Sequence, residues 1–335
     1  MPFIDEGLRY KPAIRVEGAC GTGALALVTG IKSVLAETAD VVLVIGIEVQ
    51  NTVKAIYGAD ILAAAGWAKE RKDGHAYFFP GKFSDRSKAY AERFDKEKTR
   101  KAMAKWFQNA IENARLCPTA QEYHNTTQDL IACGMVNPNP KGFVDSLNVF
   151  DCSKVSDGAS AIAIVSEEGL KRCGIAKEDA IEIMGFGQAE NDITQAPEDL
   201  TKLDTTKAAV HIAFESAGVT KEQIGTVECH DCFTIAGIMA TEAIGFAEHG
   251  KGIDFVLEGN TARDGKVPFN TTGGLIGWGH PTGATGVHQA VTIWEQLTGK
   301  AALNQIEIKP ERPYALSINM GGDDKTLVSI VYKKA

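Results

Sequence analysis

Hydrophobic residues in this chain form short apolar runs and longer stretches in which apolar residues recur every three or four positions. The short runs predict strands of a covered sheet, which is apolar on both faces, and the longer stretches predict helices with one buried side. Strands are predicted at residues 13–18, 40–49, 156–168, 180–189, 226–231, 314–322 and 326–334, and helices at 21–37, 205–219, 233–246 and 287–299. Alternating strands and helices predict an α/β fold built in layers.

Residues 51–142 depart from this pattern. They contain the aromatic run HAYFFPGKF, a charged helical stretch and the turn-rich NPNPKG, and we interpret them as an inserted loop or cap subdomain. Around it, a turn of small residues followed by a helix occurs at Cys20 and again after His280, which predicts two similar halves with a site between them. The predicted first half is 1–50 with 143–170, and the second is 171–335.

Composition narrows the class of protein. The net charge of −8 disfavours a general nucleic-acid partner, which calls for a basic surface. No apolar run is long enough to span a membrane, and the N-terminus does not resemble a targeting peptide. Seven irregularly spaced cysteines favour free thiols over a disulfide framework. We therefore expect a cytoplasmic protein without a membrane or nucleic-acid partner.

The stretch VEGACGTGALAL places Cys20 between an apolar run and a helix, with small residues on both sides. Small neighbours let a substrate approach the sulfur, and a helix N-terminus lowers the pKa of a thiol. These are the features of a nucleophilic cysteine. The alternative is a cysteine that packs as a small hydrophobic residue.

The stretch VECHDCFTIAG, residues 227–237, holds Cys229, His230 and Cys232. Cys-x-x-Cys is only half a zinc site, and the chain has no second such pair, so we expect no bound metal. Strand alternation would point Cys229 and His230 to opposite faces, and Cys232 would lie at a turn into a helix, where a thiolate is favoured. His230 and Cys232 could thus share a catalytic surface while Cys229 is buried. A packed cysteine with a hydrogen-bonded histidine is the alternative.

Two glycine-rich stretches complete the set of candidates. Residues 270–286, NTTGGLIGWGHPTGATG, hold six glycines and would fix His280 rigidly before a helix, where it could activate a cysteine. A phosphate-binding loop is the alternative interpretation, but neither G-x-x-x-x-G-K-[ST] nor G-x-G-x-x-G after a strand is present. In NMGGDDKT, residues 319–326, the Gly-Gly pair between two strands predicts either a backbone oxyanion wall or a plain turn.

Taken together, EGACGTGALAL, HDCF, GGLIGWGHPTGATG and NMGG resemble the thiolase superfamily in order and position, over nearly the whole chain. HDCF is similar to the branch of sterol-carrier-protein-2-type thiolases, where other thiolases carry Asn-Glu-Ala-Phe. The resemblance implies two pseudo-symmetric βαβαβ halves in α/β/α/β/α layers. It also implies a homodimer or tetramer.

For activity, the resemblance implies acyl transfer with coenzyme A as co-substrate: thiolysis of a β-ketoacyl-CoA or the reverse Claisen condensation. Cys20 would carry the acyl group, His280 would activate it, His230 would donate to an oxyanion, and Cys232 would be the acid and base. Gly279 and Gly322 would support the oxyanion sites and turns.

Two departures from the family pattern are visible. Cys20 lies only nineteen residues from Met1, so the first half is expected to lack its usual opening stretch. The family's terminal Cys-x-Gly cysteine is also missing, and Met320 or its neighbours stand there. Two alternative functions follow within the fold. One is an aldolase that cleaves a β-hydroxyacyl-CoA, and the other is a scaffold subunit paired with a small zinc-ribbon/OB-fold partner.

Overall fold

The computed structural model describes residues 6–73 and 75–335. Its helices are α1 Thr22–Leu35, α2 Ala55–Leu62, α3 Ala68–Asp73, α4 Phe78–Arg93, α5 Lys96–Ala114, α6 Leu130–Gly134, α7 Glu167–Cys173, α8 Asp204–Ala217, α9 Thr234–Ile244, α10 Gly252–Leu257, α11 Gly274–Gly277 and α12 Thr282–Thr298. Its strands are β1 Val41–Glu48, β2 Gly158–Val165, β3 Ile181–Glu190, β4 Ile224–Glu228, β5 Tyr314–Gly321 and β6 Thr326–Lys334. The predicted mixture of helices and strands is confirmed.

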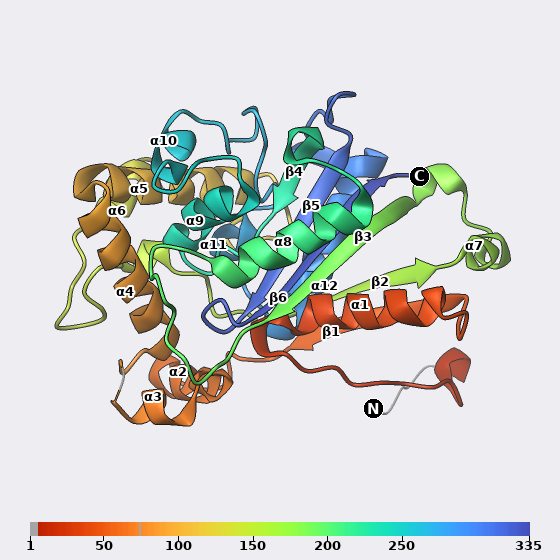
Figure 1. Cartoon of the computed structure of the whole chain (residues 1–335), viewed down its shortest axis with the longest axis horizontal. Helices are drawn as coiled ribbons and strands as arrows, with labels where there is room; N and C mark the ends of the chain where they lie inside the picture. The colour runs from red at the N-terminus through yellow and green to blue at the C-terminus, as the bar shows by residue number, and fades with distance from the viewer. Residues whose placement is uncertain (1–5, 74) are drawn as a thin grey trace.

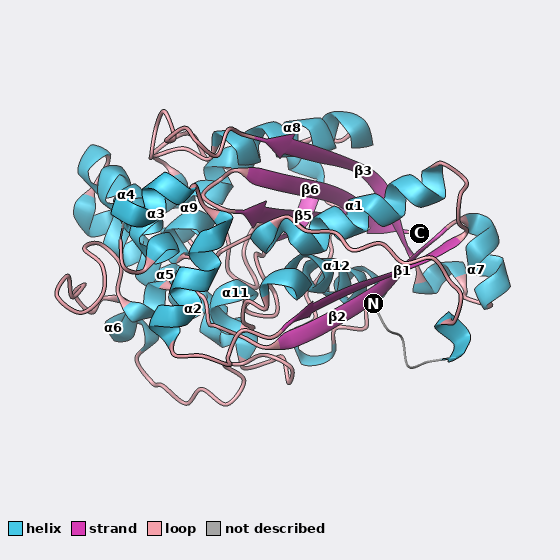
Figure 2. Ribbon diagram, turned by 90° about the horizontal axis from the view of Figure 1, so that it is seen from below, coloured by secondary structure: helices cyan, strands magenta, loops and turns pink. Residues whose placement is uncertain are grey.

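The strands form two sheets (Figures 1 and 2). In the described residues, β1 and β2 make an antiparallel pair, and the second sheet has the order β3-β6-β5-β4, in which β4 and β5 are parallel. Among the described residues the first sheet therefore holds two strands and the second holds four.

Helices α1 and α12 lie between the two sheets, as Figure 2 shows. Apolar residues from both helices and both sheets form one buried cluster there, which includes Leu27, Val44, Val287, Ile293 and Ile330. A helix with apolar surfaces on two sides can be covered by sheets on both, as α1 and α12 are here.

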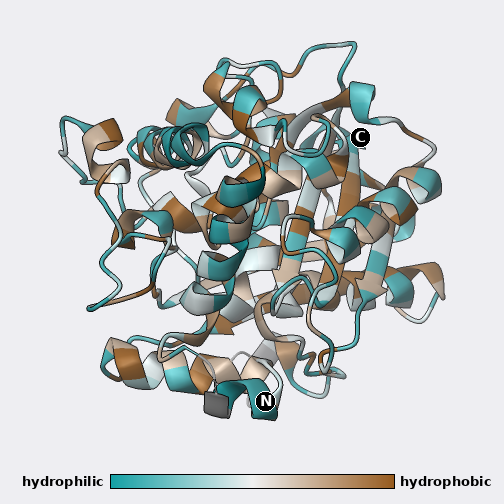
Figure 3. Cartoon of the chain, turned by 60° about the vertical axis from the view of Figure 1, so that its left-hand side comes forward, coloured by the Kyte–Doolittle hydropathy of each residue, from teal (hydrophilic) through white to brown (hydrophobic). Residues whose placement is uncertain are grey.

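Helix α8 covers the outer face of the larger sheet, while the outer face of the β1–β2 pair is exposed (Figure 2). Along β1 the apolar side chains of Val41, Leu43, Ile45 and Ile47 alternate with buried or half-buried positions and are each at least 36% exposed. Loops at the periphery are mostly hydrophilic (Figure 3).

The predicted insertion is helical, because α2 to α6 all lie within residues 51–142 and gather at one end of the sheets (Figure 1). Helix α5 begins at the N-cap Asp95, whose side chain accepts from the backbone of Lys98. Its buried residues, among them Trp106, pack against α9 of the second half. This helical segment is therefore packed into the main core.

The strand predicted at residues 13–18 is wrong. This segment has no regular structure and is largely exposed, and it pairs with no strand among the described residues. An apolar run forms a stable strand only where a neighbour completes its hydrogen bonds. No helix in the part of the chain that the structure covers is both long and apolar enough to cross a bilayer.

Candidate active site

Cys20 lies in a short 3-10 turn, Ala19–Gly21, directly before α1. Ala19 has a positive φ of 53°, a conformation that costs energy for a residue with a side chain. The carboxylate of Glu17 holds the turn by accepting the backbone N–H groups of Gly18 at 3.2 Å and Ala19 at 2.9 Å. The sharp turn places the sulfur at the N-terminal end of the helix.

Burial raises the pKa of the Cys20 thiol to about 12, although the backbone N–H groups of Cys20 itself and of Gly322 lower it. The negative charge of Glu48 adds to the rise. The helix N-terminus was expected to favour the thiolate, and here burial outweighs that effect. At neutral pH Cys20 is therefore a thiol that needs a base.

The backbone of His280 is held on both sides. Its N–H group donates to the carbonyl of Lys154 at 3.2 Å and to Oγ of Ser156 at 3.0 Å, and its carbonyl accepts from the side chain of Gln50 at 2.7 Å. These contacts come from residues of the predicted first half, whereas His280 belongs to the predicted second half. The predicted rigid placement of His280 thus depends on both halves.

The ring of His280 is oriented by α12. Its Nδ1 lies 2.7 Å from Oγ1 of Thr285, which in turn donates to the carbonyl of Pro281 at 3.1 Å. Both contacts are satisfied when Nδ1 carries the proton, which leaves Nε2 as an acceptor. Nε2 is buried and has no hydrogen-bond partner among the described residues. Burial lowers the pKa of His280 to about 3, so the ring is neutral.

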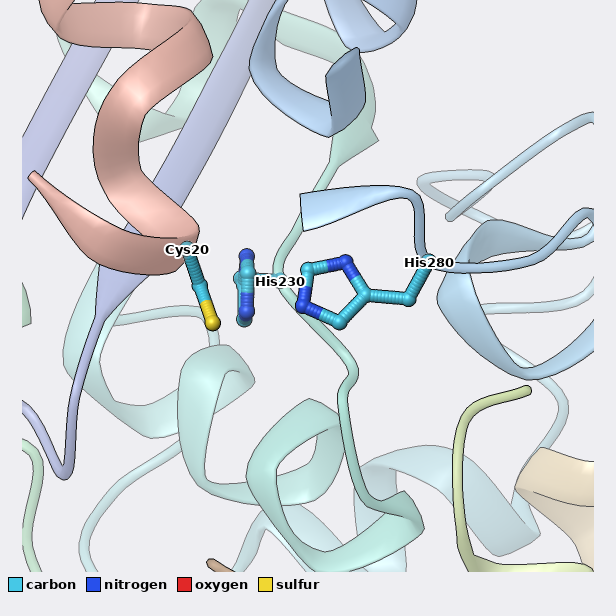
Figure 4. Close-up of side chains that lie close together, drawn as sticks. All are labelled: Cys20, His230 and His280. Atoms are coloured by element: carbon cyan, nitrogen blue, oxygen red, sulfur yellow. The ribbon is translucent and has the colours of Figure 1, made fainter. Parts of the chain in front are cut away.

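His230 faces His280, with ring centroids 5.0 Å apart and ring planes at 87°. One ring nitrogen of each histidine and Sγ of Cys20 all lie within 4.8 Å of one another (Figure 4). Burial, reinforced by the neighbouring His280, holds the pKa of His230 well below its usual range. Three residues predicted from separate motifs therefore meet at one point.

The two cysteines of the HDCF region differ in position. Cys232 is buried near Cys20, and burial, with the nearby Cys20 and Asp231 adding to it, raises the pKa of Cys232 well above its usual range. The thiolate expected there from the start of a helix is thus disfavoured in the resting site. Cys229 is fully buried in the core, as predicted, and its N–H group donates to Oδ1 of Asn270 at 2.7 Å.

The two glycines predicted as support have different surroundings. Gly279 has φ of 122°, and its N–H group donates within the turn to the carbonyl of Gly274 at 3.3 Å. The N–H group of Gly322 instead faces the sulfur of Cys20. This geometry favours a turn role for Gly279 and leaves an oxyanion role open for Gly322.

Asp231, which had no role in the sequence-based prediction, connects the HDCF segment to its surroundings. Its fully buried carboxylate accepts from Nε1 of Trp106 at 2.9 Å and from the backbone of Leu275 at 2.8 Å. Burial raises the pKa of Asp231 to about 7 despite these donors. The contacts link the segment to the helical insertion and to the glycine-rich loop.

At the point where helices α1 and α12 cross, their backbones are in direct contact and only glycine fits. A Cβ atom at Gly23 would lie 2.7 Å from the backbone nitrogen of Gly286, and one at Gly286 would lie 2.3 Å from the backbone nitrogen of Ala24. Cys20 precedes one of these helices and His280 the other. Close crossing of the two helices brings their N-terminal ends, and hence the two residues, together.

Sequence reasoning also missed Asn319, which is 1% exposed on β5 and contacts the ring of His230 through Nδ2 at 3.1 Å. The available signal was that NMGG begins with a polar residue, Asn319, inside an otherwise apolar run. Among the described residues, Cys20, His230 and His280 are also donors that could suit zinc. The same groups must stay uncoordinated if Cys20 is a nucleophile, and the absence of a bound metal stays a prediction.

Residues 185–334 match the family described as Thiolase C-terminal domain-like. The chain is 32% identical over 329 residues to an acetyl-CoA acetyltransferase of Methanothermobacter thermautotrophicus, covering 98% of this chain and 82% of that protein. It is 28% identical over 343 residues to sterol carrier protein 2 of Oryctolagus cuniculus, covering 97% and 59%. The solved Ltp2-ChsH2(DUF35) aldolase superposes with a TM-score of 0.76 at 19% identity, covering 95% of this chain and 78% of that one.

Proposed function

This chain belongs to the thiolase superfamily, as its motifs predicted, and from that premise we propose that it transfers acyl groups between CoA thioesters through an acyl-cysteine at Cys20. The predicted thiolase-like α/β fold is confirmed, and the chain is an acyltransferase enzyme. The proposed reaction is thiolysis of a β-ketoacyl-CoA or the reverse Claisen condensation, with coenzyme A as co-substrate.

The meeting of Cys20 Sγ with one nitrogen of His230 and one of His280 carries this proposal. In acylation, the thiol proton passes to Nε2 of His280 while Sγ attacks the thioester carbonyl. The bond from that carbon to the CoA sulfur then breaks. Because the thiol pKa is raised and the imidazole pKa is lowered, the resting pair is neutral, and proton transfer accompanies attack.

The second half-reaction needs an acid that becomes a base, and we assign this role to Cys232, which is buried near Cys20. Its thiol proton would pass to the departing CoA thiolate, and the resulting Cys232 thiolate would take the α-proton of the second thioester. The carbanion then attacks the acyl carbon, and Sγ of Cys20 leaves with the proton stored on His280. Run backwards, the same steps are thiolysis.

Negative charge forms twice on a thioester oxygen, and two sets of donors are available for it. The Gly322 N–H faces the Cys20 sulfur, and a His230 ring N–H would face the substrate on the other side. Fixed donors of this kind contribute roughly 10²–10³ in rate for each one. We assign Gly322 and His230 to these two sites.

The expected assembly is a homodimer or tetramer, and the exposed apolar face of β1–β2 supports association, because such a patch is seldom left in water. A small zinc-ribbon/OB-fold partner stays a second proposal. Size measurement of the purified chain, alone and with a candidate partner, separates the two. A monomer in both samples would contradict them.

The reaction is tested by mass spectrometry after incubation with acetyl-CoA or acetoacetyl-CoA. An acyl adduct on the peptide that contains Cys20 is expected, and it should vanish in Cys20→Ala but persist in Cys173→Ala, the matched control at an exposed cysteine. An adduct that survives in Cys20→Ala would refute the assignment. Cleavage of a β-hydroxyacyl-CoA without free CoA and without an adduct would favour the aldolase function instead.

A further inference from the structure

Asn319 is a buried polar residue that the steps above leave without a role. It lies on β5, between the ring of His230 and the first turn of α1. Its side chain is 1% exposed, so both ends of its amide need partners within the protein. Both ends have one, and the two partners differ in chemical character.

The partners fix the orientation of the amide. Oδ1 of Asn319 accepts the backbone N–H of Ala24 at 3.3 Å, and Nδ2 lies 3.1 Å from Nδ1 of His230. The flipped amide would place its NH2 group against the N–H of Ala24, donor against donor. Gly286 leaves the space for Oδ1, since a Cβ atom there would lie 2.5 Å from it. The NH2 group is therefore aimed at His230.

A neutral imidazole has one protonated and one bare nitrogen, and the nitrogen that meets an NH2 donor must be the bare one. We propose that Asn319 is a positioning residue that holds His230 as the Nε2–H tautomer, so that His230 can only donate to the reacting oxygen. This inference rests on the proposed function for its catalytic consequence, but the tautomer itself does not depend on any reaction.

His280 is held in the opposite form. Its Nδ1 meets Thr285, whose hydroxyl proton goes to the carbonyl of Pro281, so its Nε2 is the bare nitrogen. Two neutral imidazoles at a centroid distance of 5.0 Å thus have different roles: His280 accepts the proton of Cys20, and His230 donates. With both rings in the same form, the site would have either no base or one oxyanion donor fewer.

The direct test is 15N NMR of the histidine rings in the free protein, with each signal assigned by its loss in a single-residue variant. His230 is expected with Nδ1 bare and Nε2 protonated, and His280 with the reverse. In Asn319→Asp the carboxylate still accepts from Ala24 but requires a proton on Nδ1 of His230, so that nitrogen should become protonated. A protonated Nδ1 on His230 in the unaltered protein would overturn the proposal.

Kinetics give a second measurement. Asn319→Asp should lower kcat for acyl transfer by roughly 10² or more with little change in KM, the loss expected for one oxyanion donor. Activity should recover partly as the pH falls, because the introduced carboxylate favours an imidazolium that again carries Nε2–H. The other titratable groups facing the His230 ring, His280 and Cys20, stay uncharged over this range by burial.

Asn319→Ala separates a tautomer effect from loss of shape. It removes the donor without imposing the wrong proton, so its kcat should lie between those of the unaltered protein and Asn319→Asp. Equal losses in the two variants, with no pH recovery, would mean that Asn319 acts only by packing. If the tautomers are as expected but no acyl-Cys20 forms with any thioester, the proposed function fails while this inference stands.

Discussion

Replacing Arg86 by methionine should destabilise the protein by about 3–5 kcal/mol, because it leaves a carboxylate buried without its counter-charge. Arg86 is 1% exposed on α4, and its Nε donates to Oδ1 of Asp323 at 2.5 Å. Its Nη1 also donates to the carbonyls of Leu200 and Lys202, at 3.2 and 2.7 Å. Methionine keeps most of the volume of the stem but supplies no donor.

The change should also lower activity, since Asp323 directly follows Gly322, whose N–H faces Cys20. Urea unfolding followed by tryptophan fluorescence measures the stability loss, and a thioester assay measures the rate. Arg93→Met is the matched control on the same helix: Arg93 is half exposed in its pair with Asp199, so it should cost only about 0–1 kcal/mol.

A second variant identifies the cause of the loss. Removing the charge as well, in Arg86→Met with Asp323→Asn, should recover part of the stability, because the uncompensated carboxylate is then gone. Equal losses in Arg86→Met and Arg93→Met would refute the reasoning, since burial would then make no difference to the value of the ion pair.

Three further outcomes are expected. The acylation rate should be flat from about pH 5 to 9, because burial places the pKa of His280 at about 3 and that of Cys20 at about 12; a loss of rate on acidification centred near pH 6.5 would contradict this. Thr285→Val should reduce kcat more than Thr285→Ser, because only serine keeps the oxygen that accepts from His280; equal rates of acyl-enzyme formation would count against that contact. Gly286→Ala should destabilise the fold by about 1–3 kcal/mol or more in a melting experiment, since its Cβ meets the backbone of α1, whereas Gly58→Ala, with no atom nearer than 3.8 Å, should not.

The sequence pattern predicted the positions of most helices and strands, because these depend on the spacing of apolar residues within each segment. The run from Thr326 to Lys334 forms β6 over its predicted length, and the predicted helix 205–219 forms α8, Asp204–Ala217. The helix predicted from residue 287 begins earlier, at Thr282, because the glycines after His280 pack against α1 and β1 instead of forming a loop. The run at 13–18 has the same local character as a strand, but strand formation depends on a neighbour that sequence periodicity does not reveal.

For the candidate site, the residues could be predicted from the sequence but their protonation states could not. Cys20, His230 and His280 were identifiable because each residue type carries recognisable chemistry within a specific motif, and the structure brings them together. Their protonation was not predictable from the sequence. A helix N-terminus favours the thiolate of Cys20, but the burial that opposes it comes from packing of distant segments. Asn319 was missed for the same reason, since its effect depends on the ring that it meets across the fold.

The chemistry of this site depends on the contacts of Nδ1 in each histidine. Burial makes both rings neutral, so the Nε2 atom of each ring can either donate or accept but not both. Which of the two it does is determined by the contact that Nδ1 makes on the other side of the ring. In His280 the contact of Nδ1 is with Thr285, within the first turn of α12, so the role of His280 as a base depends on local sequence. In His230 it is with Asn319, 89 residues away on β5, so that role requires the second half to be folded around α1. Loosening the contact between α1 and β5 should therefore reduce the donor function of His230 before it affects the base function of His280.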